Sequence, residues 1–140
     1  MHCVKIEPFL KKTRKIKMIK IIVDKISKKE LTQLCKQYFK HFVKFVVDIK
    51  KKSIAVGGEM HADAEALLLE NGSKQKDLWG GNLYPENDPE ERVEYESFIN
   101  IRPTDDNFSM CVGELKIKDE IRRIVELKLL SPDEQIKLDK

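Results

Sequence analysis

Two short apolar runs on either side of a lysine-rich connection constrain the fold more than any other feature. Across residues 44–49, large apolar side chains recur at every second position, and a period of two predicts a strand. Residues 50–53, Lys-Lys-Lys-Ser, make a short connection, and residues 54–56 begin a returning strand. Because a connection this short joins antiparallel neighbours, the sequence predicts an antiparallel sheet.

Three other segments are predicted to add strands. Residues 18–23, Met-Ile-Lys-Ile-Ile-Val, form a first strand, and residues 77–84 show no helical period. Residues 93–103 alternate along their whole length, which predicts a long strand with one apolar face, made of Val93, Tyr95, Ile99 and Ile101. The sheet should therefore contain about five or six strands.

Two helices are predicted to cover one face of this sheet. Ser27-Lys28-Lys29-Glu30 has the pattern of a capping box, and apolar residues at helical spacing follow, which predicts a helix over about residues 28–41. Asp119 is predicted to cap a final helix, and Ser131-Pro132 to begin a short last turn. The predicted fold class is α+β, a single domain whose mainly antiparallel sheet is packed by an N-terminal and a C-terminal helix.

The length of 140 residues suits one domain with a core of its own. Residues 1–17 are rich in lysine and have no sustained period, so we expect a basic flexible extension there. The domain itself should span residues 18–130, and residues 131–140 should form a C-terminal tail.

Charge is divided unevenly along the chain. Residues 1–53 carry 16 Lys and Arg against 4 Asp and Glu, whereas residues 54–114 carry 4 against 14. Opposite charges attract within one chain or between copies, so the pattern is compatible with a homo-oligomer, and solvated lysines alone give the same composition. A basic segment also suits polyanions. Sheets that bind nucleic acid carry basic and aromatic residues, however, and this sheet region is acidic, so we do not expect nucleic acid as a partner.

The cysteines and apolar runs limit the compartment. Cys3, Cys35 and Cys111 are odd in number and form no Cys-x-x-Cys, which argues against a disulfide framework or a zinc knuckle. No apolar run approaches the ~20 residues of a membrane-spanning helix, and no signal peptide follows the basic start. We expect a cytoplasmic protein that does not enter membranes.

Residues 57–72 hold the densest run of functional side chains, and two interpretations are open. Helix formers fill residues 64–70, and Asn71-Gly72 suits either a hairpin turn or the end of a helix. We favour a strand and hairpin, with a helix as the alternative. As a strand, the segment would place four functional side chains on one face, namely Glu59, His61, Asp63 and Glu65. As a helix, it would still place His61 and Glu65 together.

These side chains define the candidate site. Carboxylates beside an imidazole suit a divalent metal or an acid–base pair, so the candidate metal ligands are Glu59, His61, Asp63 and Glu65. The candidate catalytic residues are His61, Asp63 and Arg102, whose planar guanidinium suits a substrate anion. The candidate ligand-binding residues are Trp79, Asn100 and Arg102. An antiparallel sheet with one solvated face, and a tryptophan that anchors the core, would carry the same residues without any site.

Several ordered motifs resemble a known family. They are Val46-Val47-Asp48-Ile49, the segment from Gly57 to Glu65, Asn71-Gly72-Ser73-Lys74-Gln75, Asp77-Leu78-Trp79-Gly80, and Asn100-Ile101-Arg102-Pro103 with Asn107 beyond. Together they resemble a family of small prokaryotic proteins catalogued as domain of unknown function 5674, over about residues 18–130. The resemblance implies that these segments are the family's signature. It implies no reaction, cofactor or partner.

Three functional hypotheses follow. The leading one is a small-ligand or metal-binding, regulatory module that uses a polar, acidic sheet face around Glu59, His61, Asp63 and Arg102. The alternative is a metal-assisted or acid–base hydrolase that uses the Glu59, His61 and Asp63 cluster. The third is a protein-interaction subunit, a homo-oligomer in which the basic N-terminal part docks on the acidic middle of a second copy. A divalent metal is the one cofactor that these residue types suggest.

Overall fold

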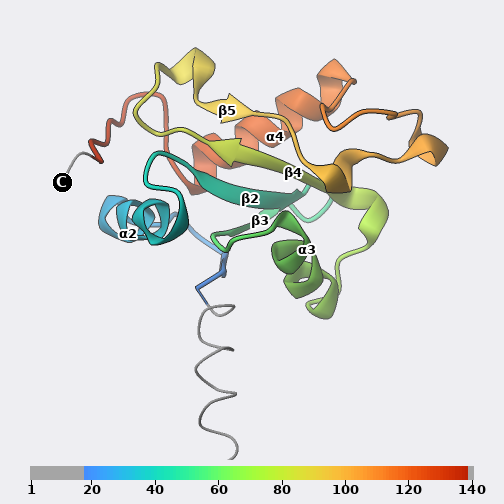
Figure 1. Ribbon diagram of the computed structural model, residues 1–140, viewed down its shortest axis with the longest axis horizontal. Helices are drawn as coiled ribbons and strands as arrows, with labels where there is room; N and C mark the ends of the chain where they lie inside the picture. Colours follow the sequence, from blue (N-terminus) through green and yellow to red (C-terminus); the bar gives the residue numbers. More distant parts are fainter. Residues whose placement is uncertain (1–17, 139–140) are drawn as a thin grey trace, which may run out of the picture.

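An antiparallel sheet forms the centre of the molecule, as predicted. The computed structural model describes residues 18–138, so the predicted N-terminal extension, residues 1–17, lies outside the described residues. Five strands pair in the order β1-β3-β2-β4-β5, each antiparallel to its neighbour. They are β1 (Lys20–Ile22), β2 (Val43–Asp48), β3 (Ser53–Val56), β4 (Leu78–Leu83) and β5 (Val93–Glu94). The predicted α+β class is confirmed (Figure 1).

The predicted hairpin is formed by β2 and β3, and a buried carboxylate fixes its turn. Asp48 is fully buried at the end of β2. Its Oδ1 accepts hydrogen bonds from the amides of Lys50 and Lys51, each at 2.9 Å, and its Oδ2 accepts one from Ser73 Oγ at 2.5 Å. One side chain thus ties the turn to the segment that precedes β4.

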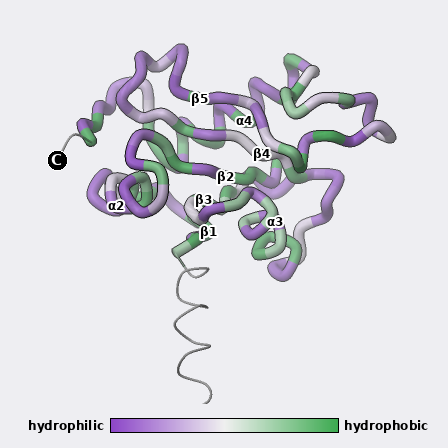
Figure 2. Tube along the Cα trace, in the orientation of Figure 1, coloured by the Kyte–Doolittle hydropathy of each residue, from purple (hydrophilic) through white to green (hydrophobic). Residues whose placement is uncertain are grey.

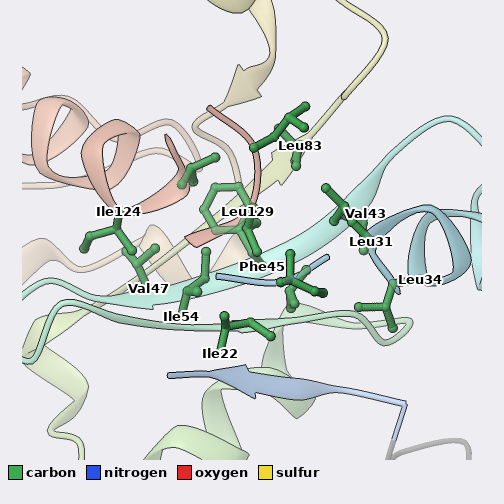
Figure 3. Packing of buried hydrophobic residues seen from close by; sticks show 14 of the residues in the cluster. Ile22, Leu31, Leu34, Val43, Phe45, Val47, Ile54, Leu83, Ile124 and Leu129 are labelled. Atoms are coloured by element: carbon green, nitrogen blue, oxygen red, sulfur yellow. The ribbon is translucent and has the colours of Figure 1, made fainter. Parts of the chain in front are cut away.

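The two predicted helices cover one face of the sheet, as expected, and a third helix covers the other face. The helices α2 (Lys28–Tyr38) and α4 (Leu115–Lys128) pack on the side that carries Phe45. Helix α3 (His61–Glu70) packs on the opposite side, through Ala64 and Leu68. Figure 2 shows apolar residues concentrated on the central strands and hydrophilic residues on the outer loops. Figure 3 shows Phe45 in the middle of the larger cluster, which residues of α2 and α4 surround.

Residues 61–70 form a helix, so the favoured interpretation as a strand and hairpin is wrong. Gly57 and Gly58 both have positive φ, 110° and 87°, and they turn the chain out of β3 before the helix begins. At the other end, Gly72 has a φ of 97° and the Ser73 amide donates to Leu68 O at 3.0 Å. Asn71-Gly72 therefore ends a helix here, and a hairpin is not made. Ala64 and Leu68 of α3 are buried against the sheet. This burial selects the helix over the strand, although the local sequence is compatible with both.

The long strand predicted for residues 93–103 is also wrong beyond its first two residues. After β5 the chain forms an isolated bridge between Glu96 and Cys111, a 3₁₀ turn (Phe98–Asn100) and a second bridge between Arg102 and Asn107. We call residues 96–111 the irregular hairpin. Its backbone leaves the sheet because the side-chain amide of Asn100 takes the backbone hydrogen bonds that a paired strand would make with β4.

The predicted helices exist, with different ends. Ser27 Oγ accepts from the Glu30 amide at 3.1 Å, so the serine half of the predicted capping box is confirmed, whereas the Glu30 carboxylate accepts from Lys20. The helix ends at Tyr38, before the predicted residue 41. The predicted cap of the last helix is wrong, because α4 begins at Leu115 and Asp119 lies inside it. The segment predicted as a C-terminal tail contributes two side chains to the larger core cluster, Ile136 and Leu138. Within residues 18–138, no helix has the length and apolar character needed to cross a membrane.

Candidate functional site

His61 is the first residue of α3, and its ring lies against the glycine pair of β4. Its Nε2 lies 2.8 Å from Gly81 O. Because a carbonyl oxygen only accepts, Nε2 carries the proton, and Nδ1 of the neutral ring carries the lone pair. A Cβ on Gly80 would lie 3.2 Å from His61 Cδ2, so the glycine leaves room for the ring.

The environment of His61 keeps the ring neutral. Burial is the largest cause and lowers its pKa; the nearby Lys44 charge lowers it further. The Gly81 carbonyl, the Asn82 amide and the Glu94 carboxylate act in the opposite direction, but the net pKa lies below the ordinary value of 6.5. At physiological pH the site therefore offers an imidazole with an unprotonated Nδ1.

A row of polar side chains crosses the sheet beside His61. Lys44 of β2 pairs in register with Asn82 of β4, which pairs with Glu94 of β5. Paired residues of neighbouring strands point to the same face, and here that is the face of α3. The three residues therefore form a continuous line at the start of α3, next to the part of this face that α3 covers.

Asn82 is the buried member of this row. It is 8 % exposed, and its Nδ2 donates to Glu94 Oε1 at 2.8 Å. The opposite amide orientation would place two acceptor oxygens against each other, so this contact fixes which way the amide points. Asn82 Oδ1 is buried, and among residues 18–138 it has no hydrogen-bond partner. The amide nevertheless lies close enough to His61 to raise the pKa of that ring.

Aromatic rings border the row at one end. Phe42 and Tyr84 are stacked with their centroids 4.9 Å apart, and Phe39 stacks on Phe42 at 4.6 Å. Lys44 Nζ lies 5.2 Å from the centroid of Phe39. Burial, and then the Glu94 charge, raise the pKa of Tyr84. We refer to Lys44, His61, Asn82, Tyr84 and Glu94 as the His61 patch.

The four predicted metal ligands are not brought together. In an α-helix, residues two apart point in very different directions, and Glu59 precedes α3. Glu65 lies one helical turn beyond His61, where its Oε2 is 3.5 Å from Gln75 Nε2. In the part of the chain that the structure describes, no group of three or more His, Cys, Asp or Glu side chains could hold a metal ion. Asp63 lies near Tyr38, whose pKa is raised by burial and then by the Glu59 and Asp63 charges.

Asn100, a predicted ligand-binding residue, has its side-chain amide hydrogen-bonded to backbone groups at both ends. It is fully buried, its Oδ1 accepts from the Gly80 amide at 2.9 Å, and its Nδ2 donates to Gly80 O and to Met110 O, each at 3.0 Å. The side-chain amide thus occupies the place of a paired strand residue beside Gly80. The missing side chain of Gly80 also leaves room for Ser97, since a Cβ at position 80 would lie 2.7 Å from Ser97 Cβ.

Arg102 and Trp79 form a second polar cluster, which the structure places apart from the His61 patch. The Arg102 guanidinium lies 3.8 Å from the centroid of the Trp79 ring, and its Nη1 donates to Gln75 O. Its Nε lies 3.6 Å from an oxygen of Asp105, too far for a hydrogen bond. Among residues 18–138, Arg102 Nε and Nη2 and Trp79 Nε1 are buried without partners. Burial lowers the pKa of Arg102, and the charges of Asp105, Glu65 and Asp77 oppose this.

Two open cavities lie elsewhere. One of about 420 Å³ lies between β1 and α2, and one of about 410 Å³ lies between residues 85–89 and the C-terminal segment. Arg92 lines the second cavity, but its guanidinium is used by three carbonyl groups, those of Asn87, Ser131 and Glu134. Neither cavity is lined by a residue of the predicted site.

Of the residues of the His61 patch, the sequence singled out His61 as a candidate and placed Glu94 only on the polar face of a predicted strand; it did not name Lys44, Asn82 or Glu94 as site residues. In its strand each of the three is next to an apolar residue, Val43, Leu83 or Val93, and therefore faces the opposite side from it. Only the pairing register brings the three together, and that register cannot be derived from the sequence of any one strand.

Comparisons with known proteins identify a family and no activity. No curated protein and no solved structure matches the chain significantly. The family described as "Protein of unknown function (DUF5674)" matches residues 20–128, which is most of the chain and includes every residue of the His61 patch. The chain belongs to this family.

Proposed function

We propose that the protein is a small-molecule-binding module and that the His61 patch holds the ligand. The observation that carries the proposal is the buried Asn82 Oδ1, which has no hydrogen-bond partner among residues 18–138. A buried acceptor without a donor destabilises a fold by about 1–3 kcal/mol, so such an atom beside other polar groups favours a site that an additional molecule completes.

The chemistry of the patch favours a planar ligand that carries N–H donors. Three neighbouring groups accept hydrogen bonds: Nδ1 of neutral His61, Oδ1 of Asn82 and the carboxylate of Glu94. Tyr84 and Phe42 give the row an aromatic border on which a flat group could stack. Lys44 is the one cation of the patch, and Glu94 on the same row offsets its charge.

Two ring compounds of similar size test this preference. Benzamidine carries an amidinium with N–H donors, whereas benzoate carries only acceptors. We expect benzamidine to shift the NMR signals of the His61 ring and the Asn82 side-chain amide in the full chain, and benzoate to leave them unchanged. His41, an exposed histidine outside the patch, is the internal control. Equal shifts from both compounds, or shifts confined to His41, would contradict the proposal.

An acid–base hydrolase is the second candidate, and the neutral His61 ring is the observation that favours it. An unprotonated Nδ1 is the form that a general base requires. Hydrolysis of an activated ester such as p-nitrophenyl acetate by the full chain, compared with His61→Gln and with His41→Gln, tests this candidate. Equal rates for all three proteins would remove His61 as a base.

We infer a cytoplasmic location from the cysteines. Cys35 and Cys111 are unpaired, and burial raises the pKa of the Cys35 thiol to about 12. Unpaired thiols of this kind are typical of a reducing compartment. Fractionation of cells that express the full chain would test the inference.

A further inference from the structure

We propose that three exposed apolar side chains of the irregular hairpin form a docking surface for residues 1–17 of a second copy of the chain. The side chains are those of Phe98, Ile101 and Phe108, which are 77 %, 41 % and 70 % exposed. We call them the Phe98 triad. The inference uses residues other than the His61 patch, so it stands or falls independently of the proposed ligand.

The backbone places the members of the triad side by side. Arg102 and Asn107 form an antiparallel bridge, so the flanking residues Ile101 and Phe108 stand directly opposite each other. Asn107 is buried whereas Ile101 and Phe108 are exposed, as expected for residues that alternate between two sides. The Ile101 amide donates to Phe98 O at 3.1 Å, and residues three apart in such a tight turn lie on one side.

The triad is held on a well-bonded support. Asn107 Nδ2 donates to Asn100 O, Ser109 O and Cys111 O at 2.8 to 3.1 Å, and its Oδ1 accepts from the Gly113 amide at 2.9 Å. Asn100 ties the same hairpin to Gly80 of β4. A preorganised apolar surface loses little conformational freedom on binding, and aromatic residues contribute most of the energy of many interfaces.

Charge around the triad selects the occupant. The irregular hairpin carries three exposed carboxylates, Glu96, Asp105 and Asp106. Its single cation, Arg102, turns its side chain inward and is 11 % exposed there. The surface is therefore apolar with an acidic border, and it suits a segment that is both apolar and basic.

Residues 1–17 have that composition. They contain six Lys and Arg against one Glu, together with apolar residues at Val4, Ile6, Phe9, Leu10 and Ile16. The chain enters the described structure beside β1, at one edge of the sheet, whereas the hairpin follows β5 at the other edge. The segment of the same copy would have to cross the sheet to reach its own triad, a distance that 17 extended residues can span; we assign the segment of a second copy, and the oligomeric state decides between the two.

Sedimentation velocity of the full chain tests the proposal. We expect a dimer that weakens as salt is raised, because screening shortens the range of charge attraction. Phe98→Ser/Phe108→Ser should lower the association constant at least about tenfold, and so should Lys11→Glu/Lys12→Glu/Arg14→Glu. A mixture of the two variants keeps one intact segment and one intact triad. It should therefore associate more strongly than either variant alone.

Leu115→Ser/Leu127→Ser is the matched control, because these α4 leucines are 75 % and 68 % exposed and lie outside the triad. It should associate like the unaltered chain. The proposal is overturned by a monomeric unaltered chain, by undiminished association of the lysine and arginine variant, which would mean that triads bind each other, or by a mixture that remains monomeric. Circular dichroism of each variant confirms that it is folded.

Discussion

The molecule contains three buried asparagines near β4 and the irregular hairpin, and they differ in one respect. Asn100 and Asn107 use both ends of their side-chain amides on backbone groups. Asn82 donates to Glu94, but among residues 18–138 its oxygen has no hydrogen-bond partner. A fully bonded amide stabilises a particular backbone path, whereas a buried oxygen without a donor lowers stability. The comparison separates residues that hold the fold from a residue that is available for binding.

Removing Asn100 should have the largest effect. Asn100→Ala leaves the amide and carbonyl of Gly80 and the carbonyl of Met110 without their partner, and each buried group costs about 1–3 kcal/mol. We expect the free energy of unfolding to fall by about 4 kcal/mol in urea denaturation. Asn71→Ala is the control, because Asn71 is exposed and makes one side-chain bond, to Leu67 O. Equal losses for the two variants would contradict the role assigned to Asn100.

Filling the space at Gly80 should disturb the same region less. The new Cβ of Gly80→Ala would lie 2.7 Å from Ser97 Cβ, closer than two carbon atoms can approach without movement. Overpacking of this kind costs about 1–3 kcal/mol, and we expect a loss of about 2 kcal/mol by the same measurement. Gly113→Ala, where the nearest atom is 3.2 Å away, should be better tolerated. A neutral Gly80→Ala would show that the segment around Ser97 yields easily.

The pH dependence of stability should report on His61. Its pKa is lower in the folded protein than the ordinary value of 6.5, so the unfolded chain binds a proton more readily. The stability that His61 contributes is therefore fully present above about pH 6.5 and is lost as the pH falls through the folded pKa. Unfolding free energies measured from about pH 8 to pH 5 should fall less steeply for His61→Gln than for the unaltered chain. Identical slopes would contradict a buried, neutral His61.

Removing Asn82 should have the smallest effect on stability. Asn82→Ala loses one hydrogen bond to Glu94 but also removes the unpartnered oxygen, so we expect a change within about 1 kcal/mol. Benzamidine binding should weaken at the same time. A loss as large as that of Asn100→Ala would place Asn82 among the residues that hold the fold, and would remove the main support for the ligand proposal.

Local patterns predicted the parts of the fold that local interactions decide. The alternation in β2, the return through β3 and the Ser27 cap of α2 each depend on residues a few positions apart, and all three are present. Residues 61–70 were predicted wrongly because helix formers and Asn71-Gly72 are compatible with two structures. Burial of Ala64 and Leu68 against the sheet selects one of them.

Two other features depend on contacts between distant segments. Residues 93–103 alternate like a strand, but the amide of Asn100 replaces strand pairing at Gly80. The alternation of apolar and polar residues does not reveal that a side-chain amide will take the place of strand pairing. In the candidate site, His61 was predicted from its residue type, whereas Lys44, Asn82 and Glu94 come together only through the register of three strands.

The clamp around Arg92 has a consequence for the cooperativity of unfolding. Arg92 binds the carbonyls of Ser131 and Glu134, and Leu138 donates its amide to Glu86 at 3.0 Å. The Ile26 amide meanwhile donates to Lys128 O at 2.9 Å. Residues 128–138 are therefore bonded both to the chain just before β5 and to the segment between β1 and α2. Detaching them would also withdraw Ile136 and Leu138 from the larger core cluster, so this segment and the sheet should unfold as one cooperative unit.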